Sequence, residues 1–129
     1  IDVSGSTNIG TLNLGNNLLS GTFDCGVSYP ILTSLTLSGN TGITAVNCSN
    51  GNLTSFSGSS MTGLTSLNLS GNKITSFYGY NYSNNLININ LSNNLITTVQ
   101  SITTAYLPNL RTLDLSNNRI DINGIGSNQ

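Results

Sequence analysis

Histidine is absent from the 129-residue chain, and its few ionisable side chains are scattered. The carboxylates are four Asp and no Glu, and the cations are Lys73, Arg111 and Arg119. Without an imidazole there is neither a Ser-His-Asp arrangement nor a histidine metal site. Neutralising a phosphate backbone takes clustered Lys and Arg, which three isolated cations do not provide. The sequence therefore predicts no enzyme activity, no cofactor, no metal and no nucleic-acid partner.

Uncharged polar residues dominate the composition, with 22 Asn, 19 Ser and 16 Thr. Only 5% of the residues are charged, where about 25% is usual. Leu, Ile, Val and Phe nevertheless recur at even spacing, so the chain can bury a core and is not a disordered polar tract. No apolar run reaches the length of about 18 residues that a membrane span needs.

A short motif, L-x-L-x-x-N-x-(L/I), repeats along the chain. The best copies are residues 12–19, 67–74, 89–96 and 113–120. In a strand, L-x-L places two apolar side chains on one face, and the Asn follows where the chain must turn. If the copies stack as coils, Asn72, Asn94 and Asn118 form an internal ladder whose amides bond backbone groups left unpaired by the strands.

This motif resembles the leucine-rich-repeat family, in its short-coil extracellular or surface type, over nearly the whole chain. The resemblance implies a solenoid of parallel strands that binds partners on its concave face. Asn, Ser, Thr and Gly are weak helix formers, so we expect a β-rich solenoid with little or no helix on the convex side.

The spacing of apolar residues sets the coil frame. Coil starts at 21 to 24 residue intervals predict six coils of about 22 residues, beginning at Ile1, Phe23, Val46, Leu67, Ile89 and Leu113. The next residue in every coil is Asp or Asn. Residues 1–122 then form the solenoid and 123–129 an end or linker, and the start at Ile1 suggests a segment of a longer or processed chain. One conflict stays open, because the strong copies at Leu12 and Leu35 fall in the opposite half of their coils.

The same frame stacks Cys25 on Cys48 and Asp2 beside Asp24. Both cysteines should point into the core, where a thiol replaces Leu well. A disulfide is the alternative, but parallel Cβ vectors suit it poorly, so we favour free thiols. The two Asp would lie about 5 Å apart, close enough for an acid–base pair or a weak calcium site. We favour a solvated surface pair.

The outward positions of the coils are the candidate partner-binding surface, small-side-chained and almost uncharged. Its residues are Asn47, Ser49, Ser66, Asn68, Ser70, Asn88, Asn90, Ser92, Thr112, Asp114 and Ser116. A second candidate is an aromatic patch on one exposed loop, made of Tyr78, Tyr80 and Tyr82, with Phe77 in the core. Sequons for N-glycosylation stand at Asn47, Asn52, Asn68, Asn81 and Asn90. Glycans on three of these would cover the concave face.

We expect a secreted or cell-surface recognition module, such as part of an adhesin or receptor, that binds a protein or glycan without inserting into a membrane. A structural alternative is a fibre or appendage subunit that stacks end to end, since low charge removes repulsion between copies. A minor alternative is binding to ice or another crystal surface through rows of Thr and Asn.

Overall fold

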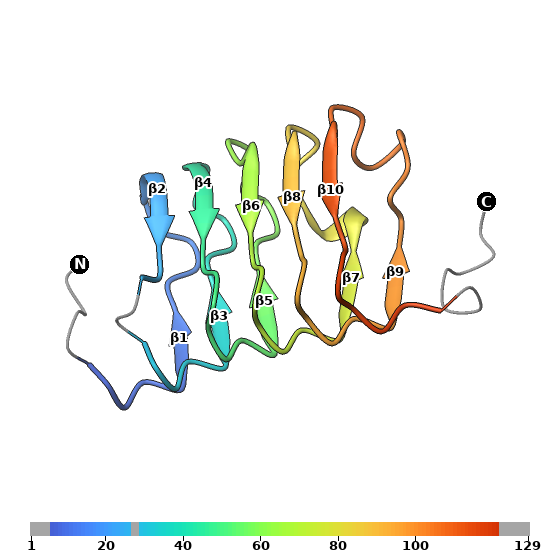
Figure 1. Ribbon diagram of the computed structural model, residues 1–129. Helices are drawn as coiled ribbons and strands as arrows, with labels where there is room; N and C mark the ends of the chain where they lie inside the picture. Colours follow the sequence, from blue (N-terminus) through green and yellow to red (C-terminus); the bar gives the residue numbers. More distant parts are fainter. Residues whose placement is uncertain (1–5, 27–28, 122–129) are drawn as a thin grey trace.

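The computed structural model describes residues 6–26 and 29–121, apart from the side chain of Tyr80, and shows a β-solenoid of about five turns (Figure 1). Each turn contributes short strands to two long sides of the solenoid. One side consists of β2 (Ser20–Asp24), β4 (Gly42–Asn47), β6 (Ser66–Asn68), β8 (Asn88–Asn90) and β10 (Thr112–Asp114). The other consists of β1 (Thr11–Asn13), β3 (Ser34–Thr36), β5 (Ser55–Ser57), β7 (Ser76–Tyr78) and β9 (Thr98–Gln100).

The first side is a five-stranded parallel sheet in the order β10-β8-β6-β4-β2. Its register aligns the predicted coil starts in one row, namely Phe23, Val46, Leu67, Ile89 and Leu113. The predicted coil frame is therefore confirmed over these strands. Six coils is one too many, because the structure has about five turns and Ile1 lies outside the described residues.

The second side is divided into a three-stranded sheet, β1-β3-β5, and a two-stranded sheet, β7-β9. Leu12 and Leu35 are paired here, in line with Phe56. This resolves the conflict in the frame: the strong motif changes sides, lying in β1 and β3 early in the chain and in the five-stranded sheet from β6 onward. Either side can hold it, because each needs only an inward apolar residue followed by a turn.

Helical structure is nearly absent, as the composition predicts. The described residues contain a single short 3-10 helix, η1 (Gly79–Asn81), and no α-helix. None of the helical structure in this part of the chain is long and apolar enough to cross a membrane.

The core is a column of aliphatic side chains enclosed between the two sides. Leu67 and Leu69, the two leucines of one motif, are each only 1% exposed, while Asn68 between them points outward. Burying each such side chain contributes about 1.5–3 kcal/mol, and a single coil cannot supply this burial without neighbours.

Buried asparagines satisfy the backbone where each coil turns. The Asn94 amide donates to the carbonyls of Leu69 (2.9 Å) and Leu91 (3.1 Å), and its oxygen accepts from the Ile74 N–H (3.0 Å). Asn72 and Asn118 make the equivalent bonds to backbone groups of their own coil and of the preceding one. In the described residues, no buried side-chain polar atom lacks a partner.

A further asparagine of this kind, absent from the predicted ladder, is Asn40. It is fully buried, donates to the carbonyls of Leu14 (2.9 Å) and Leu37 (2.7 Å), and accepts from the Leu19 N–H (3.2 Å). It closes the motif that begins at Leu35. The motif was visible in the sequence, but its position on the opposite half-coil concealed its structural role.

Candidate functional site

The predicted partner-binding residues lie along the outer face of the five-stranded sheet and in the turns that follow its strands. Seven are strand residues of β4, β6, β8 and β10, and four serines follow the strands: Ser49, Ser70, Ser92 and Ser116. Their accessibility varies. Asn88 and Thr112 are exposed, whereas Ser92 is buried at 6%. We call the eleven residues the outer sheet face.

The column of Asp and Asn on this face has a structural cause. The Asn68 Oδ1 accepts from both the N–H (3.1 Å) and the hydroxyl (2.8 Å) of Ser70, which closes a turn at the strand end. Asn90 with Ser92, and Asp114 with Ser116, repeat this geometry. Asp and Asn make this bond best, because their short side chains carry an acceptor oxygen at the right distance, so the geometry favours them at this position.

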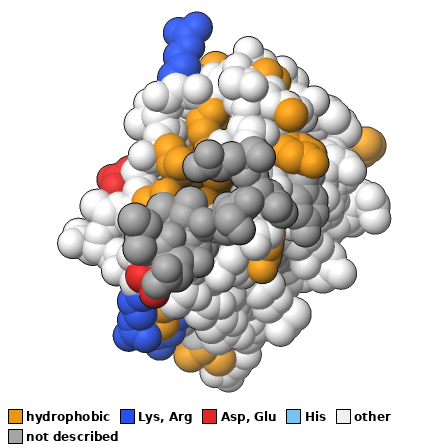
Figure 2. Space-filling view, turned by 90° about the vertical axis from the view of Figure 1, so that its right-hand side faces the viewer, with side chains coloured by type: hydrophobic (Ala, Val, Ile, Leu, Met, Phe, Trp, Pro, Cys, Tyr) orange, Lys and Arg blue, Asp and Glu red, His pale blue; other side chains and the backbone are white. Residues whose placement is uncertain are grey.

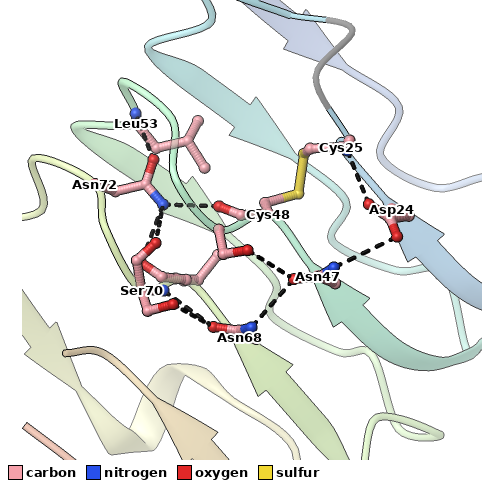
Figure 3. The surroundings of a disulfide bond; sticks show 11 residues. Asp24, Cys25, Asn47, Cys48, Leu53, Asn68, Ser70 and Asn72 are labelled. Atoms are coloured by element: carbon pink, nitrogen blue, oxygen red, sulfur yellow. Dashed lines mark hydrogen bonds between the residues drawn. A yellow bond between two sulfur atoms is a disulfide. The ribbon is translucent and has the colours of Figure 1, made fainter. Parts of the chain in front are cut away.

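Amides of the column also link neighbouring strands (Figure 3). The Asn68 amide donates to the Asn47 Oδ1 at 3.1 Å, and the Asn47 amide donates to the Asp24 carboxylate at 3.4 Å. Ser49 donates to the same Asn47 oxygen at 3.1 Å. These side chains are therefore held in place before any partner binds.

Charge is sparse on this surface. Hydrogen bonds from the hydroxyl and the N–H of Ser116 lower the pKa of Asp114 from its ordinary value of 3.8. No cluster of three or more potential metal-ligating residues exists among the described residues. The proposed partner of Asp24, Asp2, lies outside them, so the structure does not describe that pair.

Cys25 and Cys48 form a disulfide, so the favoured expectation of two free thiols is wrong. Their Cα atoms lie 4.7 Å apart, within the range that a disulfide spans. Each cysteine follows directly after the last residue of its strand, Asp24 of β2 or Asn47 of β4. The backbone bonds between coils continue to both residues, since the Cys25 N–H donates to the Asn47 carbonyl and the Cys48 N–H to the Asn68 carbonyl. The short Cα separation thus permits the disulfide even between stacked parallel coils.

A hollow of about 320 Å³ adjoins the disulfide. Its walls come from the segments that follow the two cysteines. They consist of Cys25, Gly26, Tyr29, Pro30, Leu32, Cys48, Ser49, Asn50, Gly51, Asn52, Leu53 and Asn72. A second hollow of about 230 Å³, lined by Asp24, Gly26, Asn47, Ser49 and Asn50, shares three of these residues with the first.

The repeat pattern of the sequence does not reveal this hollow, although a signal for it is present. Stacking Cys25 on Cys48 also brings together the residues that follow them, Tyr29 on one coil and Asn50 and Asn52 on the next. Composition did not distinguish these amides from the other asparagines of the chain.

The predicted aromatic patch is not one exposed loop. Tyr82 packs partly buried against the core, with its ring stacked on Phe77 (centroids 4.8 Å apart) and Phe56 (6.2 Å apart). Burial raises the pKa of the Tyr82 phenol above its ordinary value of 10.0. Tyr78 is partly buried at the end of β7, and the side chain of Tyr80 lies outside the described part. The sequence places three tyrosines close together but does not show that the chain after η1 folds one of them inward.

The five sequons lie in different environments. Asn47, Asn68 and Asn90 are partly buried members of the outer column, and their side chains hold the turns and neighbouring strands. The Asn52 amide donates to the Pro30 carbonyl at 2.8 Å. Asn81 is exposed in η1.

Stacked parallel strands, inward leucines and a recurring buried asparagine define a repeat solenoid. Two family models match: "Leucine Rich repeats (2 copies)" over residues 84–127 and "Leucine Rich Repeat" over residues 63–80. Residues 63–80 and 84–127 are therefore leucine-rich repeats. Neither match is to an enzyme family.

A solved structure with the same fold is that of the Toll–Spätzle complex of Drosophila. The two chains superpose with a TM-score of 0.57 at 23% sequence identity. The alignment covers 93% of this chain and 18% of the other, so this chain spans less than a fifth of that chain's length. A search of curated proteins found no match.

Proposed function

We propose that the protein is a non-catalytic extracellular recognition module that binds a protein partner through the outer sheet face. The observation that carries this proposal is the hydrogen-bonded state of that face. Asn47, Asn68 and Ser70 are fixed by one another, so binding does not have to order them. Preorganisation of this kind lowers the entropic cost of association.

The face has no aromatic or Arg side chain of its own. Such residues usually anchor protein interfaces, so the partner must contribute them. In the matched structure, Toll is in complex with another protein, Spätzle. The Toll–Spätzle complex and the leucine-rich repeats of this chain support a protein partner for the outer sheet face.

The disulfide supports an extracellular location. Disulfides persist in oxidising compartments and are rare where thiols are kept reduced. The Cys25–Cys48 bond is also well shielded, with both residues at most 7% exposed.

The test is a screen of secreted and cell-surface ectodomains against the wild-type chain, followed by charge-bearing substitutions. Asn88→Arg with Thr112→Arg places two large cations on the exposed part of the outer sheet face. We expect a partner's affinity to fall about tenfold or more. The matched control is Thr11→Arg, an exposed strand threonine on the opposite side, in β1. Binding that withstands the double substitution and is lost in the control would contradict the proposal.

Self-assembly is the second candidate, supported by apolar side chains at both ends. Leu18, near the first turn, is fully exposed, while Leu113, Leu115 and Ile120 are only partly buried. Figure 2 looks onto the end that carries β10 and shows hydrophobic side chains there, with charged ones toward the margin. Sedimentation velocity decides this: growth into polymers with concentration would favour a fibre subunit, and a constant monomer would exclude it.

A further inference from the structure

The hollow beside the disulfide has two kinds of wall. Its apolar part consists of Leu32, Leu53 and the Cys25–Cys48 bond, all nearly inaccessible, together with Tyr29 and Pro30. Its volume of about 320 Å³ lies at the lower end of the range for small-molecule sites, roughly 300–1,000 Å³. A ligand of this hollow is therefore small and has an apolar surface to place against the wall.

The polar part differs from the outer sheet face in what its side chains contact. The Asn47 and Asn68 side chains already bond their neighbours. Among the described residues, by contrast, the Asn50 amide and the Tyr29 hydroxyl have no hydrogen-bond partner. Both groups can donate and accept, so they suit a ligand with hydroxyl groups.

Two bonds join the walls of the hollow across two coils. The Cys25–Cys48 disulfide joins the coils at one side of the hollow, and the Asn52 amide bonds the Pro30 carbonyl at the other. The Asn50 N–H is also fixed, donating to the Ser70 carbonyl of the following coil at 2.8 Å. A rigid site loses little entropy when a small ligand enters.

The charge of the lining residues indicates which class of ligand the hollow accepts. None of the residues that line the hollow carries a formal charge, and the adjoining hollow contributes only the Asp24 carboxylate. An anion finds no positive charge to pair with among these residues, and the Asp24 carboxylate repels it from one side. A neutral ligand avoids both the repulsion and the cost of desolvating an unpaired charge.

We propose that this hollow binds one neutral sugar residue of a glycan, with the Tyr29 ring against the apolar C–H face and the Asn50 amide on the hydroxyls. A pyranose has an apolar C–H face and a rim of hydroxyl groups, so it fits a hollow with one apolar and one polar wall. A tyrosine ring with its polar hydroxyl suits such a ligand. The adjoining hollow, which shares Gly26, Ser49 and Asn50, gives the next sugar of the chain a place. The hollow meets the outer sheet face at Ser49, but this proposal does not depend on a protein binding to that face.

The test titrates glucose, galactose, mannose and N-acetylglucosamine, one at a time at millimolar concentrations, into the 15N-labelled chain. We expect at least one of them to shift the backbone amides of Asn50, Gly51 and Asn52. Glucuronate, an anionic probe of similar size, should bind more weakly than glucose. No shift with any neutral sugar, or tighter binding of glucuronate, overturns the proposal.

Matched variants assign the effect to the hollow. Asn50 has a φ of 56°, so Asn50→Gly removes the amide without backbone strain. Asn117→Gly is the control, since Asn117 has a φ of 54° in a different coil. We expect Asn50→Gly and Tyr29→Ala each to weaken sugar binding about tenfold, with Asn117→Gly neutral. Equal loss in Asn50→Gly and Asn117→Gly, or no loss in Tyr29→Ala, would remove the basis of the proposal, provided dispersed amide spectra show that each variant is folded.

Discussion

Asparagine has two different structural roles in this protein, and hydrogen bonding distinguishes them. Asn94 is buried and bonds backbone groups of its own coil and the preceding one. Asn68 lies on the surface and closes a turn while bonding a neighbouring strand. The abundance of one amino acid therefore reflects two repeated positions in the coil, and the cost of replacing it depends on the position.

Asn94→Ala should destabilise the protein strongly. It leaves the Ile74 N–H without its side-chain partner, while the Leu69 carbonyl keeps its bond from the Asn72 amide, and an unsatisfied buried group costs about 1–3 kcal/mol. We expect the free energy of unfolding, measured in urea, to fall by about 1–3 kcal/mol. Asn88→Ala, at an exposed position of β8, is the control and should change it by less than about 0.5 kcal/mol. Similar losses in both variants would contradict this role.

Gly71 is required by both its backbone and its neighbour. Its φ is +66°, and an added Cβ would lie 2.6 Å from the Asn50 Oδ1. Gly71→Ala should therefore cost about 1–3 kcal/mol in urea unfolding. Gly10→Ala, where the nearest atom would be 3.9 Å away, should be tolerated. Adding Asn50→Gly to Gly71→Ala removes the side-chain oxygen that the new Cβ meets, so part of the lost free energy of unfolding should be recovered. If none is recovered, the whole loss comes from the backbone conformation of residue 71.

At the scale of elements, two contacts add to the sheets: one joins neighbouring strands of the same sheet, and the other bridges two sheets. The disulfide joins the ends of β2 and β4, and it closes a loop with a sequence separation of 23. Reduction, or Cys25→Ser with Cys48→Ser, should lower the free energy of unfolding by about 2–4 kcal/mol. Thermal unfolding with and without dithiothreitol measures this. The double variant should be insensitive to the reductant, and a wild-type midpoint that does not fall on reduction would show that the bond adds no stability.

The second contact bridges the gap between β5 and β7, which belong to different sheets. Tyr82 stacks on Phe77 of β7 and on Phe56 of β5. Because burial raises its pKa above 10.0, the folded state binds this proton more tightly than the unfolded state. The associated stability is present below pH 10 and is lost as the pH rises further.

Alkaline unfolding tests this arrangement. Tyr82→Phe keeps the ring stack and removes the ionisation, so its stability above pH 10 should fall less than that of the wild type. The difference in stability between the two proteins at neutral pH is the reference from which the loss above pH 10 is counted. Circular dichroism against pH records the difference. Tyr82→Phe that unfolds at the wild-type pH would show that Tyr82 does not control the alkaline transition.

At the scale of the whole molecule, the sequence predicts the repeating parts and misses the contacts specific to one place. Phe23, Val46 and Leu67 set the coil frame, because an inward apolar residue is needed at every turn. The disulfide depends instead on two residues that follow strand ends, and the inward position of Tyr82 depends on the segment after η1. The hollow depends on Tyr29 meeting Asn50 across two coils. Such contacts occur once, so no periodicity signals them.

The repeating architecture also predicts what the chain tolerates. Asn88 and Thr112 are register partners on neighbouring strands, so deleting residues 89–112 connects Asn88 to Leu113 in the same register one coil earlier. In a solenoid each coil contacts mainly its neighbours. We therefore expect this shortened chain to keep its β-type circular dichroism and a cooperative transition, with a lower midpoint.

Deleting only residues 89–99 removes less than half of that segment. It connects Asn88 of the five-stranded sheet to Gln100, the last residue of β9 on the opposite side. The remaining half-coil cannot close, and the inward and outward faces after the junction lose their alignment with the preceding coils. This variant should not unfold cooperatively. If it folds as well as the full-coil deletion, the unit of stability is the single motif and not the two-sided coil. If both shortened chains are unfolded, the contacts that occur once contribute more to stability than the repeated packing of coil on coil.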